Sequence, residues 1–155
     1  MKVSCDVNYR SKLWSAEEAR EVISELISDL DLLLVGQGDL QTLWKRSGNP
    51  EKELRRLQDE FRIADVVMTR GPEGAIGLFG DAIHQQEAFA SEVVSPIGAG
   101  DAFLAVTALL LALGGDTEDV GFIGNVVGGI KIRLIGHSAC IQKGDVKKSI
   151  ISLLK

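Results

Sequence analysis

The sequence predicts an α/β fold with a largely parallel sheet and flanking helices, and three observations support this. Short, continuous apolar runs alternate with helical stretches over the first two-thirds of the chain, which is typical of parallel strands joined by helices. Two further apolar segments on either side of Gly80-Asp81 indicate a β-hairpin. The chain has 155 residues, 45% of them hydrophobic and 25% charged, which is enough for one domain with a core of its own. We therefore predict a single domain over residues 1–155.

Capping residues mark where the predicted helices begin. Ser15 and Glu18 form a capping box, and the helix that they open ends near Ser28. Asn49 is a good N-cap, and Pro50 fits the first position of another helix. The predicted elements in chain order are a strand over 2–7, the helix ending near Ser28, a buried strand over 30–35, a short helix near 40–45, the helix that begins at Pro50, a strand over 63–69, hairpin strands over 75–79 and 83–90, and helices over 102–113, 116–134 and 145–154.

Composition and charge argue against several classes of partner. The net charge is −5 and no dense cluster of lysine and arginine occurs, so we expect no nucleic-acid partner. The longest uncharged run, over residues 102–115, is shorter than a bilayer span, and the N-terminus lacks the apolar core of a signal peptide. The two cysteines, Cys5 and Cys140, are far apart in the sequence and form no disulfide framework. We therefore predict a cytoplasmic protein without a membrane partner.

The most informative segment is Gly98-Ala99-Gly100-Asp101, which precedes a long apolar run that reads as a buried helix. A helix N-terminus presents unpaired amides and the positive end of the helix dipole, and glycine lets an anion approach the backbone closely. An aspartate beside such a phosphate site could take the proton from an attacking hydroxyl, as phosphoryl transfer requires. Helices also favour an acid in the first turn for stability alone, so the tetrapeptide leaves both interpretations open.

This tetrapeptide, followed by Ala102-Phe103 and the apolar helix, resembles the C-terminal signature of the ribokinase-like (PfkB) carbohydrate kinases. The resemblance implies a Rossmann-like ribokinase fold and ATP-dependent phosphorylation of a hydroxyl on a sugar or sugar acid. It also implies that Asp101 is the general base and that the amides of Gly98, Ala99 and Gly100 form an anion hole. The cofactors it implies are ATP and Mg²⁺.

Two further segments resemble the nucleotide-binding parts of that family. Thr69, Gly71 and Gly74 match its Gly-x-x-Gly turn, which lies along the phosphates and ribose of the nucleotide. Asn125 matches an asparagine in the helix beside the adenine pocket, whereas Gly128 and Gly129 stand where alanines are usual in that helix. An ordinary glycine turn would explain the first segment by itself. The second segment contains three glycines, Gly124, Gly128 and Gly129, and each weakens a helix by about 1 kcal/mol relative to alanine. Close packing of this helix against other parts of the protein would by itself explain why they are there.

The segment over residues 6–14 resembles the Asp-x-Asn-x-Arg…Leu-Trp stretch of the family, and its 2-keto-3-deoxygluconate kinase branch in particular. The resemblance implies that Arg10 holds a sugar-acid carboxylate or the phosphate in transit and that Asn8 lines the same cleft. The arginine fork suits both groups. The alternative to a ligand-binding role for Arg10 is an ion pair with Asp6 near the end of the strand. Trp14 is predicted to be a core or lid-edge residue and not a ligand contact. Residues 122–143 fit the heptose-phosphate kinase branch equally well.

The sequence also departs from the family pattern. Ser95-Pro96-Ile97 stands where an aspartate is usual, which weakens the inference of a monovalent-cation site near Ser95 and Ser138. An Asn-x-x-Glu segment that organises Mg²⁺ in many members would fall at residues 36–39, where only Asp39 carries a carboxylate. Asp39 is therefore the one candidate metal ligand. Neither His84 nor His137 has a catalytic or metal-binding residue at close spacing in the sequence, and both are predicted on the surface or in loops.

Members of the family are longer chains, and their N-terminal half carries most of the sugar pocket and the β-sheet lid. By resemblance, this chain corresponds to the C-terminal, nucleotide-binding half. The alternative to an active kinase is therefore a catalytically incomplete nucleotide-binding fragment or one subunit of a split kinase. An uncovered strand edge would favour either a homodimer or pairing with a complementary N-terminal half.

Overall fold

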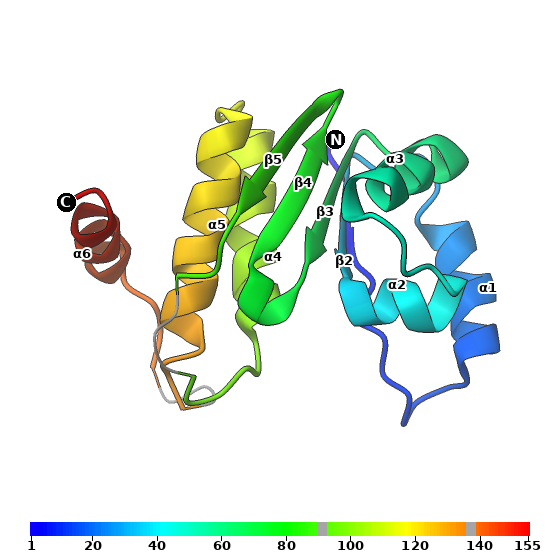
Figure 1. Ribbon diagram of the computed structural model, residues 1–155, viewed down its shortest axis with the longest axis horizontal. Coiled ribbons are helices and arrows are strands. Elements are labelled where there is room, and N and C mark those ends of the chain that lie inside the picture. Colours follow the sequence, from blue (N-terminus) through cyan, green and yellow to red (C-terminus); the bar gives the residue numbers. More distant parts are fainter. Residues whose placement is uncertain (90–92, 136–138) are drawn as a thin grey trace. The chain divides into compact units, whose positions relative to one another are not determined.

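A five-stranded sheet with the strand order β1-β2-β3-β4-β5 organises the first half of the chain in the computed structural model (Figure 1). The strands β1 (Ser4–Asp6), β2 (Leu32–Gly36) and β3 (Asp65–Thr69) are parallel, and Leu34 pairs with both Asp6 and Val67. The strand β4 (Ala75–Phe79) runs antiparallel to β3, and β5 (Ala82–Gln86) follows β4 in the sheet. The prediction of a largely parallel sheet that ends in a hairpin is confirmed.

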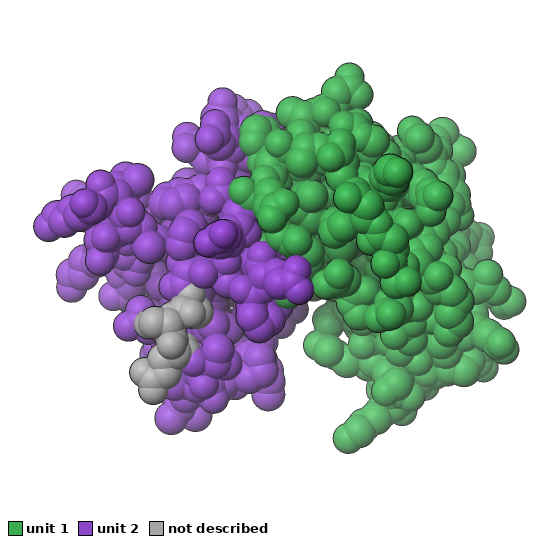
Figure 2. All heavy atoms as spheres, in the orientation of Figure 1, with its two compact units in different colours: residues 1–70, 75–85 green, residues 71–74, 86–155 purple. Residues whose placement is uncertain are grey.

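The structure describes residues 1–89, 93–135 and 139–155, which divide into two units (Figure 2). Unit 1 consists of residues 1–70 and 75–85, and unit 2 of residues 71–74 and 86–155. That residues 1–155 form a single domain stays a prediction.

Three helices pack with the sheet in unit 1. They are α1 (Ala16–Leu26), α2 (Gln37–Trp44) and α3 (Pro50–Phe61), with α3 against β3 and β4, and α2 against β2 and α1. The predicted capping box is present, because the Ser15 hydroxyl accepts the amide of Glu18 and the Glu18 carboxylate accepts the amide of Ser15. Residues that are almost fully buried come from both the strands and the helices and include Ile27, Leu33, Val35, Leu54, Leu57, Val66, Met68 and Leu78.

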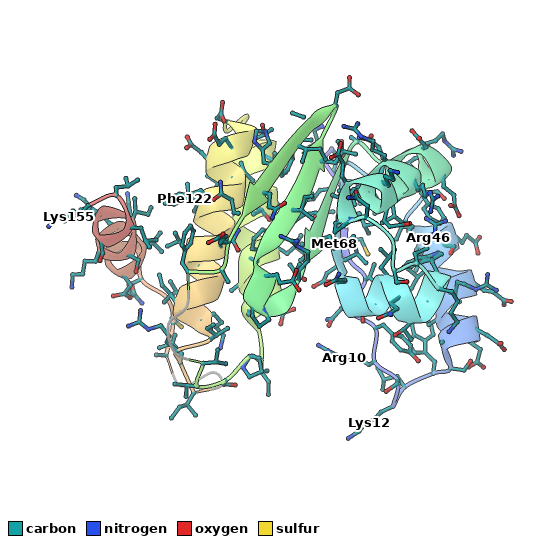
Figure 3. All side chains as sticks on the ribbon, in the orientation of Figure 1. Arg10, Lys12, Arg46, Met68, Phe122 and Lys155 are labelled. Carbon is teal, nitrogen blue, oxygen red and sulfur yellow. The ribbon has the colours of Figure 1, made fainter. Side chains whose placement is uncertain are left out.

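Unit 2 is helical. Its helices are α4 (Ala99–Ala112), α5 (Thr117–Lys131) and α6 (Lys143–Leu153), preceded by a 3-10 turn over Gly71–Glu73. The helices α4 and α5 pack along each other, and α6 contacts α5. Phe122, labelled on α5 in Figure 3, makes an edge-on ring contact with Phe89 at a centroid distance of 5.3 Å. Among the described residues, no helix is long and apolar enough to cross a bilayer.

Several details differ from the sequence-based expectations, among them the second hairpin strand, which ends at Gln86. The helix α4 is not buried throughout: Phe103 and Thr107 are buried, whereas 58% of Leu109 and 75% of Leu113 are exposed. The run is apolar on all sides, but α5 covers only one of them. His84 lies in strand β5 and not in a loop, and its half-buried ring is 5.9 Å from that of Phe79. The helix predicted over 116–134 ends at Lys131.

Trp14 packs against the core of unit 1, as the sequence suggested. His137 and Ser138 lie outside the described residues, as does Ala90 at the end of the predicted hairpin strand.

Candidate functional site

The start of α4 places the predicted phosphate-binding amides in one turn. Gly98 is the N-cap, with φ 81° and ψ 7°, a left-handed conformation that glycine adopts without strain. Its carbonyl accepts the amide of Ala102 at 3.0 Å, which closes the first helical turn. No side chain among the described residues caps this helix start, and the amide of Ala99 makes only a long bond of 3.4 Å to the carbonyl of Pro96. An anion could therefore satisfy amides of the kind that α1, α3 and α5 direct to a capping side chain.

Asp101 is the third residue of α4, and its side chain is exposed. Its Oδ2 atom lies 3.8 Å from the position that a Cβ atom on Gly98 would take. The carboxylate is thus beside the glycine N-cap, close to the amides of the same turn. Gly98, Ala99, Gly100 and Asp101 share the first turn of α4, and an acid in this turn also suits the helix dipole.

The loop before α4 is attached to the end of α5. The amides of Val94 and Ser95 both donate to the carbonyl of Ile132, at 2.8 Å and 2.9 Å. Ile132 is the C-cap of α5, so these bonds hold the approach to Gly98 against that helix end. Ser138, the other residue considered for a monovalent cation, lies outside the described residues.

The glycines of α5 have different surroundings. A Cβ atom at Gly124 would lie only 2.7 Å from the ring of Phe103 and 2.7 Å from the methyl group of Thr107, which confirms close packing there. At Gly128 it would lie 3.8 Å from the carbonyl oxygen of Ala99, an ordinary contact. Gly128 therefore faces the first residue of α4, and a methyl group would fit at this position. Close packing between the two helices does not by itself require a glycine there.

Asn125 is buried, with 8% of its surface exposed. Its Nδ2 atom donates to the carbonyl of Gly121 at 3.1 Å, one turn earlier in the same helix. This bond fixes the side chain along α5. A fixed amide of this kind can present its remaining hydrogen-bonding groups to a ligand.

The turn after β3 contains two glycines, Gly71 and Gly74, whose surroundings differ. Thr69 ends β3, Gly71 has φ 57° and Gly74 has φ 83°, and the amide of Gly74 donates to the carbonyl of Gly71 at 3.0 Å. A Cβ atom at Gly74 would clash with the backbone of Gln86, so packing within unit 2 requires that glycine. No atom would come within 4 Å of a Cβ at Gly71, which leaves its backbone open to approach.

In unit 1, the loop after β1 carries Asn8 and Arg10, both exposed; Figure 3 labels Arg10 together with Lys12. The amide of Asn8, at φ 41°, donates to the Asp6 carboxylate at 3.1 Å. The amide of Leu13 donates to the carbonyl of Arg10 at 2.9 Å, which closes a turn around Lys12. The loop therefore has a defined backbone before any ligand binds.

Asp39 holds the same loop from the first turn of α2. Its Oδ2 atom accepts the amide of Tyr9 at 3.4 Å, and the hydroxyl of Tyr9 donates to the carbonyl of Trp14 at 3.3 Å. Burial raises the pKa of Asp39, an effect that the Tyr9 amide and the charge of Arg10 oppose. No group of three or more metal-ligating side chains is found in the described part of the chain, so Asp39 offers a single carboxylate to a metal.

Sequence reasoning missed one residue beside the predicted phosphate site. Lys131, the last residue of α5, is 92% buried, since only 8% of its surface is exposed. Its Cε and Nζ atoms lie 3.0 Å and 3.6 Å from the position of a Cβ on Gly98. A helical signal was available, because Gly124, Gly128 and Lys131 are spaced to share one face of α5.

The chain was compared with protein-family models and with known proteins, and the matches are carbohydrate kinases. The model of the pfkB family carbohydrate kinases matches residues 1–144. The chain is 30% identical over 143 residues to a 2-dehydro-3-deoxygalactonokinase of Haloferax volcanii, covering 92% of this chain and 45% of that protein. It is also 30% identical over 154 residues to an ATP-dependent 6-phosphofructokinase of Thermoanaerobacterium thermosaccharolyticum, covering 99% and 47%. The chain thus spans about half the length of these relatives.

Solved structures show the same fold. A putative ribokinase II from E. coli, solved in complex with ATP and Mg²⁺, superposes with a TM-score of 0.84 at 22% identity, covering 97% of this chain and 49% of that one. A 2-dehydro-3-deoxygluconokinase from Thermotoga maritima superposes with a TM-score of 0.80 at 21% identity, covering 96% and 49%. The predicted ribokinase-like fold is confirmed.

Proposed function

This chain belongs to the pfkB family of carbohydrate kinases, and from that premise we propose that it serves the ATP-dependent phosphorylation of a hydroxyl on a sugar or sugar acid. The observation that carries the proposal is the start of α4, where an uncapped helix N-terminus opens on a left-handed Gly98 with the Asp101 carboxylate beside it. Amides, a helix dipole and a base within one turn are the groups that phosphoryl transfer uses.

Each group of this turn has a proposed role. The amides of Gly98, Ala99 and Gly100 hold the oxygens of the transferred phosphoryl group, and the Ala99 amide makes only a long bond to the carbonyl of Pro96 that competes with this role. Donors fixed before the reaction stabilise the charge that develops in the transition state without having to reorganise. Asp101 accepts the proton of the attacking hydroxyl, for which its exposed carboxylate is accessible.

The nucleotide would be held by other residues of the chain. We assign the phosphates and ribose to Thr69, Gly71 and Gly74, with the open backbone at Gly71 as the point of approach. Asn125 and Gly128 on α5 are assigned to the adenine side. When bound, Mg²⁺ would neutralise charge on the nucleotide phosphates. Asp39 is the one carboxylate that residues 36–39 could offer to such an ion.

A sugar acid is the substrate class that unit 1 favours. Arg10 has the charge and fork geometry to bind a carboxylate, and Asn8 is on the same ordered loop. Two of the similar proteins carry the names of kinases for 2-dehydro-3-deoxy sugar acids, which supports this choice. The exposed Lys12 provides a matched control: Arg10→Ala should raise KM for sugar acids and spare neutral sugars, whereas Lys12→Ala should change neither.

The proposal is tested by incubating the purified chain with ATP, Mg²⁺ and a panel of sugars and sugar acids, together with a nucleotide titration. Sugar-dependent formation of ADP is the expected result. Binding of ATP without turnover would favour the alternative, a catalytically incomplete nucleotide-binding fragment or a subunit that needs a second copy or a complementary N-terminal half. Absence of any nucleotide affinity would contradict both.

A further inference from the structure

The helix α1, blue in Figure 1, exposes an acidic row and an apolar row side by side. Glu21 and Glu25 are four residues apart and therefore neighbours on the helix surface, and both are exposed. Val22 and Leu26 repeat the same spacing one residue later, and they are 44% and 65% exposed. We call these four residues the α1 patch.

The helix α6, red in Figure 1, exposes apolar side chains together with the opposite charge. None of the residues in this helix is buried. Lys143, Lys147, Ile151 and the C-cap Leu154 follow one another at helical spacing along one side, and all four are exposed. Ile151 is 47% exposed and Leu154 is 74% exposed. We call these four residues the α6 patch.

The charges of both patches are left without an opposite charge. Within the described residues, neither the two glutamates of the α1 patch nor the two lysines of the α6 patch form an ion pair. The one acid of α6, Asp145, accepts the amide of Gln142. In addition, α6 begins with Lys143, where the positive end of the helix dipole disfavours a cation. An acidic surface bound there would offset this penalty.

We propose that the α6 patch of one copy binds the α1 patch of a second copy of this chain. Each patch has two exposed apolar side chains to cover and two charges that match those of the other in number and differ in sign. An apolar centre beside polar groups is the usual composition of a specific interface. Opposite charges bring unlike patches together, whereas two copies of the same patch would repel each other. The chain itself therefore supplies the partner that fits each patch.

Because the two patches are different, each copy can use both of them at once. Two copies that do so reciprocally form a closed dimer with two equal contacts, and a contact that does not close extends into a larger assembly. Only a few side chains of each copy take part, so we expect a weak association that salt reduces. The surface shares no residue with the proposed kinase site.

The test exchanges the charges of the two patches. One double variant carries Lys143→Glu and Lys147→Glu, and the other carries Glu21→Lys and Glu25→Lys. All four residues are exposed, so both variants should fold, which circular dichroism checks. The single variants Lys147→Glu and Lys52→Glu form a matched pair, because Lys52 is an exposed lysine on α3 and the change of charge is the same.

Analytical ultracentrifugation measures the mass of each protein, and of an equal mixture of the two double variants, over a range of protein concentrations. The measurements are made at about 0.01 M and about 1 M salt, where the Debye length is about 30 Å and about 3 Å.

We expect the wild type to associate at low salt, and each double variant to associate at least about tenfold more weakly, because like charges then face each other. The mixture of the two double variants should associate as the wild type does, since both contacts in a mixed pair again join opposite charges. Lys147→Glu should weaken association and Lys52→Glu should leave it unchanged.

A wild type that stays monomeric at every concentration would overturn the inference. So would association that survives both charge reversals, or a mixture that associates no better than either double variant alone. None of these results would bear on the proposed function, which is tested by ATP turnover.

Discussion

The contact between α4 and α5 predicts that Gly124 and Gly128 respond to alanine in opposite ways. Both lie inside α5, and both would gain helix propensity from the substitution, about 1 kcal/mol each. They differ in what the added methyl group would touch. At Gly124 it would lie 2.7 Å from Phe103 and 2.7 Å from Thr107, whereas at Gly128 its nearest contact is 3.8 Å away.

The magnitude follows from how little those neighbours can move. Phe103 and Thr107 are 4% and 1% exposed, and the Thr107 hydroxyl donates to the carbonyl of Phe103 at 2.9 Å. An extra methyl in such packing typically costs about 1–3 kcal/mol. After the gain in propensity, Gly124→Ala should lower the free energy of unfolding by up to about 2 kcal/mol. Gly128→Ala should leave it unchanged or raise it by up to about 1 kcal/mol.

Urea denaturation followed by the helical circular dichroism signal measures both variants beside the wild type. A second readout is ATP affinity, which Gly124→Ala should reduce, because moving α5 away from α4 also moves Gly128, a proposed nucleotide-binding residue, away from Ala99. If Gly124→Ala were as stable as Gly128→Ala, the close α4–α5 contact described at Gly124 would be wrong.

Two further predictions concern unfolding. Gly74→Ala should be much more destabilising in urea than Gly71→Ala, because both have positive φ but only a Cβ at Gly74 meets backbone atoms; equal effects would contradict the packing described at Gly74. Because burial raises the pKa of Asp39 in the folded state, folding takes up protons there, and this contribution to stability declines as the pH rises above the ordinary aspartate value of about 3.9. The variant Asp39→Asn should therefore gain stability relative to the wild type as the pH rises from about 4 to 6, and a difference that does not change with pH would refute the shift.

Local sequence signals predicted most of the fold. The capping box at Ser15 and the Asn49-Pro50 helix start depend on a few neighbouring residues, and both are present in the structure. The continuous apolar runs became the parallel strands, because strands buried on both faces need no alternation. The glycine turn at Gly98 was also predictable, since its neighbours in sequence are its neighbours in space.

Features that depend on distant residues were harder to predict. The apolar run of α4 suggested burial, but no local signal indicates that Leu109 and Leu113 lie on a side that α5 does not cover. The role of Asp39 in holding the loop at Tyr9 depends on strand order, which places the ends of β1 and β2 side by side. Lys131 is 33 positions after Gly98, and only the packing of α5 brings it there.

The central claim is that the first turn of α4 combines a phosphate site with a general base, and Asp101→Asn tests it most directly. The variant keeps the size of the side chain and removes the carboxylate that would accept the proton. Sugar-dependent ADP formation should fall by about 10²–10⁴, the usual contribution of a general base, while the affinity for ATP stays close to that of the wild type. Turnover that remains within about tenfold of the wild type would contradict the claim.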